Sequence, residues 1–368
     1  MNAANQTRKH YPALDGLRGL AILLVVVYHN FGFINYFFFG WLGVDLFFVL
    51  SGFLITGILL ETQGTSGYLR NFFARRILRI FPLYYITLIA FLLLLPAVVN
   101  LPTDISYYKE NQWWLWTYLE NWLYIFKPNR QGQALNHFWS LAVEEQFYLL
   151  WPFVIVLLKK PKHLLFFMLF VLLAVMGIRA WLWMYEIKEL AYFNLYTFSR
   201  IDGICIGCMI ALIYKININF LNKYSTIIVL TLAAMNFIFY FFNKEYDFSF
   251  PYLAIVGYTT FAMMFGLLVH EAVQGKNKIV NLIFTFPLLQ FFGKISYAFY
   301  IFHWPVHLCL GPLLKPSIQK LDIGNYSNIL MALLTTLISL LLSILSYYTI
   351  ERYFLRLKKN YTFKPSVT

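Results

Sequence analysis

Arg18 and His29 are two ionisable side chains in the first long apolar segment of the sequence. They are eleven residues apart, close to three helical turns, so one face of a helix can present both. Ionisable groups inside such segments are costly to bury and usually functional. An imidazole titrates near neutral pH and can exchange protons with a reacting group, whereas a guanidinium can stabilise negative charge. The pair therefore indicates acid–base chemistry beside an anion.

Further polar side chains lie within other apolar segments, several at a depth similar to that of His29. They are Asp45, His137, Ser140, Glu144, Glu145, Arg200, Asp202 and His303. Glu144 follows His137 by seven residues, which places both on one helix face with Glu144 two turns deeper. Together these groups predict a polar cavity inside a helical bundle, open to the outer side of the membrane.

Other interpretations stay open for several of these groups. The two histidines other than His29 can each simply hydrogen-bond to a neighbouring helix. Arg200 and Asp202 can form a structural ion pair, and Glu145 can be a polar packing group that points elsewhere.

Three arginines, Arg75, Arg76 and Arg79, occur together where the third apolar segment begins. Arg76 and Arg79 are three residues apart and so lie side by side on a helix. The planar guanidinium matches phosphate oxygens, and a helix N-terminus also favours an anion. We interpret the cluster as a phosphate-binding site. The alternative is that the arginines only orient the helix in the membrane.

Membrane-spanning helices must position these side chains. Of the 368 residues, 60% are hydrophobic and 12% are charged, about half the charged fraction of a typical soluble domain. The apolar residues fall in blocks of roughly 20, the length that crosses a bilayer. The sequence predicts an all-α, polytopic transmembrane helical bundle, a single domain over residues 1–368 with about ten spans. The expected spans are 12–34, 41–60, 77–99, 137–158, 164–185, 196–214, 225–242, 252–271, 287–313 and 328–351.

The basic residues predict the orientation of the bundle. The formal net charge is +13, and most lysines and arginines lie in alternate connections, which places both termini in the cytoplasm. This distribution indicates contact with membrane lipids and an anionic substrate rather than with nucleic acid. The longest connection, 100–136, is then extracytoplasmic. Its many tryptophans and tyrosines predict a stretch in the membrane interface, a lip that stacks on sugar rings, or both.

Cys205 and Cys208 have the spacing of a redox motif but lack the βαβ context that such motifs need. With Gly203 and Gly207 they are instead expected at a close helix–helix contact. No metal site is expected.

Several motifs, in order along about residues 10–355, resemble the membrane acyltransferase-3 family. The first are Tyr11-Pro-Ala-Leu-Asp-Gly-Leu-Arg18 followed by His29, Trp41-Leu-Gly-Val-Asp45, and the RxxR pattern Arg76-Ile-Leu-Arg79. The others are Phe138-Trp-Ser140-Leu-Ala-Val-Glu144-Glu145, Arg200-Ile-Asp202-Gly, Ser296-Tyr-Ala-Phe-Tyr-Ile-Phe-His303 and Tyr348-Thr-Ile-Glu351.

The resemblance implies an O-acetyltransferase that moves an acyl group, usually acetyl from acetyl-CoA, to a hydroxyl group. In this hypothesis Arg75, Arg76 and Arg79 hold the phosphates of the donor, and His29 is the general base. Glu144 orients the imidazole, with Asp45 and Glu145 as further candidates for that role. Arg18 stabilises charge on the tetrahedral intermediate or on coenzyme A. Direct transfer and an acyl-histidine intermediate both fit.

The resemblance also implies the acceptor and the location. The expected acceptor is an extracytoplasmic glycan or lipid-linked sugar, and the expected location is the bacterial cytoplasmic membrane. Many members carry a C-terminal extracytoplasmic SGNH domain, whereas this sequence ends soon after the tenth span, which favours a stand-alone acetylase. The alternatives are a transporter or flippase of a lipid-linked sugar, and a non-catalytic receptor. No Gly/Pro-broken spans occur in matching halves, as a transporter would need.

Overall fold

The computed structural model describes residues 10–98, 100–129, 133–185, 192–193, 195–218, 220–243, 253–324 and 326–363. Its helices are α1 (Pro12–Asn30), η2 (Asn35–Trp41), α2 (Leu42–Thr62), α3 (Tyr68–Ile89), η3 (Ala90–Leu94), α4 (Leu95–Val98), α5 (Ile105–Glu110), α6 (Gln112–Trp116), α7 (Glu120–Phe126), η4 (Asn136–Phe138), α8 (Trp139–Leu158), α9 (Pro161–Met184), α11 (Thr197–Arg200), α12 (Asp202–Ile216), α13 (Phe220–Asn243), η5 (Leu253–Gly257), α14 (Tyr258–Gln274), α15 (Lys278–Phe284), α16 (Pro287–Gln319), α17 (Tyr326–Ser346), η6 (Tyr347–Glu351), α18 (Arg352–Leu357) and η7 (Lys358–Asn360). The ends of the expected domain, 1–368, and residue 252, where the eighth span was expected to begin, lie outside the described residues.

The long apolar helices confirm an all-α, polytopic membrane bundle. Within the described ranges, eight helices are long and apolar enough to cross a membrane, and nine are when α15 and α16, bent by 58°, count as one span. The remaining expected span, 196–214, corresponds to α11 and α12. α12 has only 15 residues, fewer than the roughly 20 that cross a bilayer alone. It packs inside the bundle, against α2 and α9.

α3 begins earlier than the apolar pattern indicated, at Tyr68 instead of 77. The arginine-rich segment is therefore helical, and Arg76 and Arg79 lie two to three turns inside the helix. The expected contribution of a helix N-terminus to anion binding at this cluster is wrong, because the dipole acts mainly within the first turn. Hydropathy missed this start because the first turns of α3 are polar.

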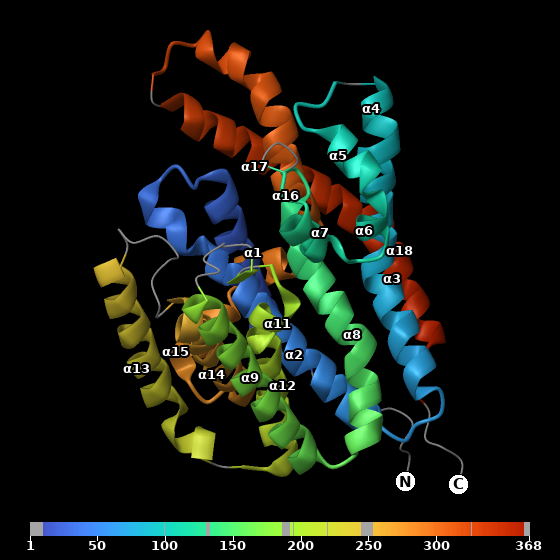
Figure 1. Cartoon of the computed structure of the whole chain (residues 1–368), viewed down its shortest axis with the longest axis vertical. Coiled ribbons are helices and arrows are strands. Elements are labelled where there is room, and N and C mark those ends of the chain that lie inside the picture. The colour runs from blue at the N-terminus through green and yellow to red at the C-terminus, as the bar shows by residue number, and fades with distance from the viewer. Residues whose placement is uncertain are drawn as a thin grey trace.

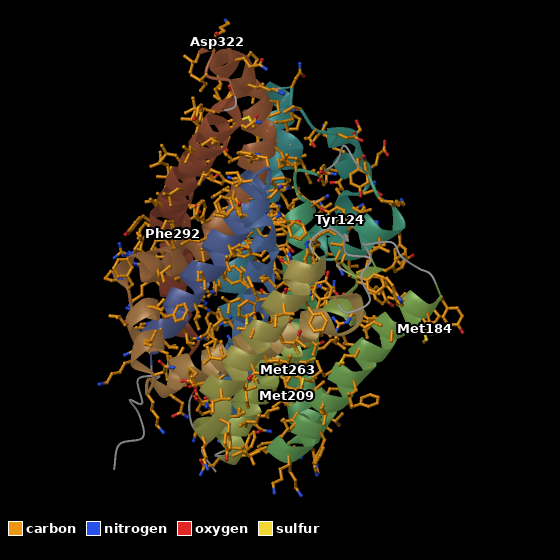
Figure 2. The ribbon with its side chains drawn as sticks, turned by 90° about the vertical axis from the view of Figure 1, so that its left-hand side faces the viewer. Tyr124, Met184, Met209, Met263, Phe292 and Asp322 are labelled. Carbon is orange, nitrogen blue, oxygen red and sulfur yellow. The ribbon has the colours of Figure 1, made fainter. Side chains whose placement is uncertain are left out.

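The bundle is organised around α1, which packs against α2 and α16. Figure 1 shows α3 and α8 on one side of the molecule and α13, α14 and α15 on the other. α16 pairs with α17, and Figure 2 shows this hairpin extending beyond the other helices to the labelled Asp322. The arrangement places α1, α2, α3, α8 and α16 around a common interior.

A close contact between α2 and α12 supports one wall of this interior. A Cβ atom at Gly207 would overlap the carbonyl oxygen of Val49, and one at Gly52 would overlap that of Ile204. Cys205 and Cys208 are buried, unpaired thiols on the same helix. The expected helix–helix contact of small residues is thus confirmed.

Gly207→Ala is expected to lower stability by about 1–3 kcal/mol, because the added methyl group must push two backbones apart. The measurement is the thermal unfolding midpoint of the detergent-purified protein. Gly57→Ala on α2 is the matched control, since a Cβ atom there meets nothing within 4 Å. Equal midpoints for the two variants would contradict the close contact.

The described parts of the connection 100–136, residues 100–129 and 133–136, contain short helices that pack partly against α3. Tyr118 stacks on Tyr84 with ring centroids 4.2 Å apart, and Trp116 stacks on Tyr85 at 5.6 Å. Trp113, by contrast, is 72% exposed. Much of the aromatic surface is therefore occupied within the protein, and Trp113 is the tryptophan of this segment most available to the membrane interface or to a sugar.

Glu120 in this segment is fully buried, and its Oε1 accepts a hydrogen bond from Tyr84 Oη at 3.2 Å. Burial raises the pKa of Glu120 well above its ordinary value, so the folded protein holds a proton that the unfolded chain releases at lower pH. The contribution of Glu120 to the free energy of unfolding is therefore largest below the pKa of the unfolded chain, and it decreases as the pH rises above that value. The unfolding midpoint should therefore decrease from about pH 5 to about pH 8.

Glu120→Gln keeps an amide carbonyl that can accept the tyrosine hydrogen bond and should flatten this dependence. Glu110→Gln, at an exposed position in α5, serves as the control. If both variants keep the slope of the unmodified protein, Glu120 is not the group responsible.

Candidate active site

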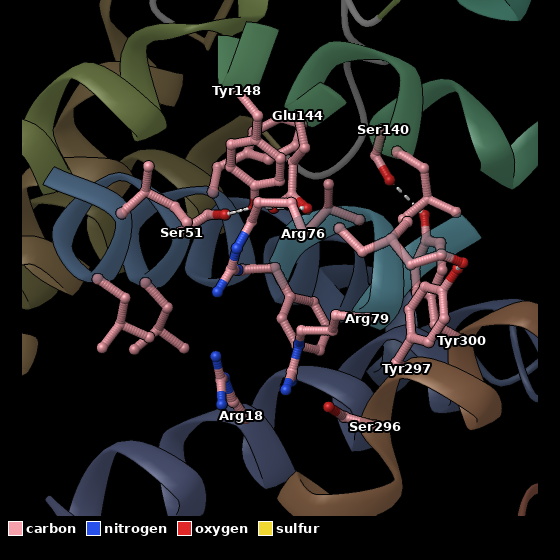
Figure 3. A pocket seen from close by; sticks show the side chains of 18 residues that line it. Arg18, Ser51, Arg76, Arg79, Ser140, Glu144, Tyr148, Ser296, Tyr297 and Tyr300 are labelled. Atoms are coloured by element: carbon pink, nitrogen blue, oxygen red, sulfur yellow. Dashed lines mark hydrogen bonds between the residues drawn. The ribbon is translucent and has the colours of Figure 1, made fainter. Parts of the chain in front are cut away.

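The first cavity, which we name the arginine cavity, comprises about 790 Å³ of space, open solvent included, between α1, α2, α3, α8 and α16. Its polar and ionisable lining residues are Arg18, Ser51, Arg76, Arg79, Ser140, Glu144, Tyr148, Ser296, Tyr297 and Tyr300. Figure 3 shows the side chains of Arg18, Arg76 and Arg79 directed toward one shared space.

The arginine cavity has an excess of positive charge. Its lining contains three guanidinium groups and one carboxylate, that of Glu144. Arg18 is 3.5 Å from Asp15 on its own helix, and Arg76 Nε is buried without a hydrogen-bond partner among the described residues. Glu144 accepts a hydrogen bond from Tyr148 Oη at 3.3 Å, and Tyr148 also bonds to Ser51. An anionic ligand would offset the excess charge and could satisfy the unpaired donor.

Arg75 lies outside this cavity, contrary to the expected triplet. Its Nη1 donates to the carbonyl oxygens of Lys358 at 3.3 Å and Tyr361 at 3.1 Å. Arg75 therefore ties α3 to the C-terminal segment, and Arg18 from α1 is the third arginine of the cluster. Neighbouring residues on a helix point about 100° apart, so Arg75 and Arg76 could not both face the same cavity.

A second cavity of about 730 Å³, named the histidine cavity, surrounds the end of α1. It is lined by Val25, Tyr28, His29, Trp41, Val44, His137, Trp139, Leu195, Arg200 and Tyr300. Val44 and Tyr300 line both cavities. The two cavities are therefore adjacent and meet at these two residues.

His303 fixes the hydrogen bonding of His29. His303 Nδ1 lies 2.7 Å from the carbonyl oxygen of Tyr300, which can only accept, so Nδ1 carries the proton. Its Nε2 then accepts a bond from His29 Nδ1 at 3.1 Å, and the same His29 nitrogen lies 3.0 Å from the carbonyl of Val25. His29 Nδ1 consequently holds a hydrogen, and the lone pair of the neutral ring is on Nε2.

His137 and Tyr300 complete the wall near His29. The His137 side chain is 2% exposed, and neither ring nitrogen has a hydrogen-bond partner within the part of the chain described. Tyr300 Oη donates to the carbonyl of His137 at 2.7 Å and lies 2.6 Å from Ser140 Oγ. An unpartnered imidazole is costly in a buried wall, so a polar ligand in the histidine cavity would stabilise it.

The carboxylates pair differently from the expectation. Glu144 lines the arginine cavity, and the partner of His29 is His303, which makes the expected Glu144–His29 contact wrong. Asp45 is buried and forms an ion pair with Arg200 at 2.9 Å, so it does not orient His29 either.

Asp202 pairs with Arg179 at 2.9 Å, not with Arg200. The guanidinium of Arg200 also lies 4.2 Å from the centroid of Tyr258. Glu145 does not line either cavity, and its Oε1 is buried without a hydrogen-bond partner among the described residues.

Sequence reasoning missed the roles of Tyr300, Tyr148 and Arg179. Tyr300 precedes His303 by three residues and Tyr148 follows Glu144 by four, so helical spacing alone could have placed both beside residues already singled out. Arg179 is an ionisable residue inside the expected span 164–185, and that position could have singled it out. Its pairing with Asp202, which lies on another helix, could not be inferred from spacing. Among the residues described, no group of three or more His, Cys, Asp or Glu is placed to hold a metal ion.

Comparison with known proteins identifies the class to which this fold and site belong. A family model described as "Acyltransferase domain" matches residues 11–348. The chain therefore belongs to this acyltransferase family, which confirms the resemblance seen in the motifs. No solved structure matches the chain significantly.

The curated relatives that the chain matches include longer bacterial proteins. Peptidoglycan O-acetyltransferase OatA of Listeria monocytogenes is 30% identical over 370 residues, which cover 94% of this chain and 56% of that protein. YrhL of Bacillus subtilis, provisionally named a peptidoglycan O-acetyltransferase, is 30% identical over 371 residues, covering 94% and 55%. A provisionally named O-acetyltransferase of Staphylococcus aureus is 30% identical over 324 residues, covering 81% and 51%. The chain spans about half the length of these relatives.

Proposed function

We propose that the chain is a membrane O-acetyltransferase of the bacterial cytoplasmic membrane. It takes acetyl from cytoplasmic acetyl-CoA and transfers it to a hydroxyl group of an extracytoplasmic glycan or lipid-linked sugar. The observation that carries the proposal is the placement of a cavity with three arginines directly beside a cavity that contains His29, whose Nδ1 is hydrogen-bonded to Val25 and His303. The names of the relatives support acetyl as the acyl group and a cell-wall glycan as the class of acceptor.

The arginine cavity fits the anionic part of the donor. The 3′-phosphate and diphosphate of coenzyme A are multiply charged, and guanidinium groups bind phosphate oxygens through paired N–H donors. Arg18, Arg76 and Arg79 come from two helices and supply such donors from opposite sides of one space. With both termini in the cytoplasm, as the basic residues predict, this cavity opens toward the compartment that contains acetyl-CoA.

The histidine cavity fits the reacting groups. Val44 and Tyr300 mark the shared wall at which the thioester of a donor held by the arginines would reach His29. The acceptor hydroxyl oxygen attacks the thioester carbonyl carbon while His29 Nε2 takes its proton. The C–S bond then breaks, and His29 returns the proton to the leaving thiolate, giving the acetyl ester and free coenzyme A.

His303 and His137 support this step in different ways. His303 is a positioning residue, because its bond to His29 Nδ1 leaves Nε2 as the basic nitrogen. His137 has unpartnered ring nitrogens that can bind the acceptor hydroxyl. The same Nε2 lone pair could also attack the thioester, so an acyl-histidine intermediate is the alternative route. Trapping labelled acetyl on the protein in the absence of acceptor would select that route.

A transporter or flippase of a lipid-linked sugar is the rival function. It would also use polar groups in the bundle, and the three arginines can bind the phosphate of a lipid-linked sugar. Moving a sugar does not require the adjacent imidazole of His29, whereas acyl transfer needs a base. The decisive experiment uses the detergent-purified chain and carbon-14-labelled acetyl-CoA. We expect saturable binding and transfer of label to a glycan fraction extracted from bacterial envelopes. Absence of binding, or transport of lipid-linked sugar without transfer of label, would overturn the proposal.

A further inference from the structure

A third cavity lies on the opposite side of the bundle from α3, between the first turns of α13 and the last turns of α14. It encloses about 490 Å³, and every lining residue is polar or charged: Asn222, Ser225, Thr226, His270, Glu271, Gln274, Lys276 and Asn277. Figure 1 shows α13 at the edge of the molecule. Within this lining Ser225, His270 and Glu271 are buried, so their polar atoms need partners in the cavity.

His270 is the group in this cavity that most needs a ligand. Its side chain is 2% exposed, and both ring nitrogens are buried without a hydrogen-bond partner among the residues described. Tyr214 packs against its ring at 5.2 Å between centroids and donates to its carbonyl oxygen at 3.2 Å. The ring is thus held in place by neighbours that leave its nitrogens unsatisfied, and a bound polar group would remove that cost.

The carboxylate in the lining of this cavity is engaged by two hydroxyl groups. Glu271 Oε1, the negative group in the lining, accepts bonds from the hydroxyls of Ser225 and Thr226, the latter at 2.8 Å. Lys276 is exposed at the segment between α14 and α15 and lines the same cavity. An ammonium and an imidazole N–H therefore remain as donors toward a ligand, and phosphate oxygens suit both.

The position of the cavity is compatible with a ligand at the membrane surface. It lies where α13 begins and α14 ends, which is the level of the lipid headgroups for helices that span the bilayer. α13 also presents apolar side chains to its surroundings, including Phe220, Ile227 and Leu230, which are 59%, 65% and 64% exposed. Acyl chains could lie along this face while a headgroup enters the cavity.

We propose that this cavity binds a phosphate group through Lys276 and His270. The phosphate belongs to a phospholipid headgroup or is free in solution, and the two sources share the same recognition chemistry. The site is separate from the arginine and histidine cavities, and its occupation does not depend on the transfer reaction.

The test measures the thermal unfolding midpoint of the full chain in detergent during titration with three probes. They are dioleoyl phosphatidylglycerol, dioleoyl glycerol with the same tails but no phosphate, and sodium phosphate compared with sodium chloride at equal ionic strength. A ligand that binds only the folded protein raises the midpoint. We expect phosphatidylglycerol to raise it and dioleoyl glycerol to leave it unchanged. A matching rise with sodium phosphate would assign the site to free phosphate.

Two variants test whether Lys276 and His270 cause the rise of the unfolding midpoint. Lys276→Gln, at an exposed position, and His270→Gln should each weaken the apparent affinity for the phosphate probe about tenfold, the effect of one charge-assisted hydrogen bond. Lys320→Gln, an exposed lysine at the end of α16, removes the same charge elsewhere and should leave the response intact. The proposal is overturned if Lys276→Gln responds like the unmodified protein, or if no phosphate probe shifts the midpoint.

Discussion

Replacing His29 by glutamine is expected to lower kcat for acetyl transfer by about a hundredfold to ten-thousandfold, the usual contribution of a positioned general base. Glutamine can keep a donor toward the carbonyl of Val25, the bond that His29 Nδ1 now makes at 3.0 Å. It cannot accept a proton at the position of Nε2. The KM for acetyl-CoA should change little, because His29 lines the histidine cavity and not the arginine cavity. Initial rates with labelled acetyl-CoA measure both constants.

His163→Gln provides the matched control for this prediction. His163 is exposed near the start of α9, so the same substitution there should leave both constants unchanged. A His29→Gln protein that folds normally and retains near-normal kcat would exclude His29 as the base and as an acyl carrier. The phosphate-binding role of the arginines would be unaffected by that result.

The helical architecture was predicted correctly where a helix is predominantly apolar. α1, α8, α9 and α16 begin within a few residues of the expected positions, because the free energy of transferring apolar side chains into lipid dominates there. The predicted helix boundaries were wrong where this transfer free energy does not determine them. The first turns of α3 are rich in arginine and lie before the hydropathy window, and α12 is buried by protein and so need not be long enough to cross lipid alone.

The candidate site, too, was predicted only in part: its residues were found, but their pairings were not. Arg18, His29 and Glu144 were singled out from their polarity in apolar segments, and Arg76 and Arg79 from the arginine cluster. The structure places all five on cavity walls.

Their partners could not be inferred from spacing, because a partner on another helix depends on how the helices rotate and cross. The pairing of His29 with His303 joins α1 to α16, and that of Asp45 with Arg200 joins α2 to α11. The division into two cavities depends on Val44 and Tyr300, and neither side chain is ionisable near neutral pH. A search for intramembrane charge therefore could not find them.

Replacing Arg76 by glutamine is expected to raise the KM for acetyl-CoA by about tenfold to a hundredfold, with a smaller change in kcat. Hydrogen bonds that involve a charged group contribute about 1.5–3 kcal/mol, and a guanidinium that binds phosphate with two N–H donors loses both on this substitution. Arg76 Nε is already buried without a partner among the described residues, so its hydrogen-bonding capacity is not spent within the protein. Equilibrium binding of labelled acetyl-CoA should weaken by the same factor.

Arg76→Lys separates the loss of charge from the loss of geometry. Lysine keeps the positive charge beside Glu144 but has no planar fork, so the KM should lie between those of the unmodified protein and the glutamine variant. Arg70→Gln, exposed in the first turn of α3, removes a charge outside the cavity and should have no effect on KM. If Arg70→Gln raises KM as much as Arg76→Gln does, the arginines act only through the general positive potential of this membrane surface, and the cavity is not the donor site. A large difference between them requires a specific contact of Arg76 with the donor, because long-range attraction would not distinguish two charges on one helix.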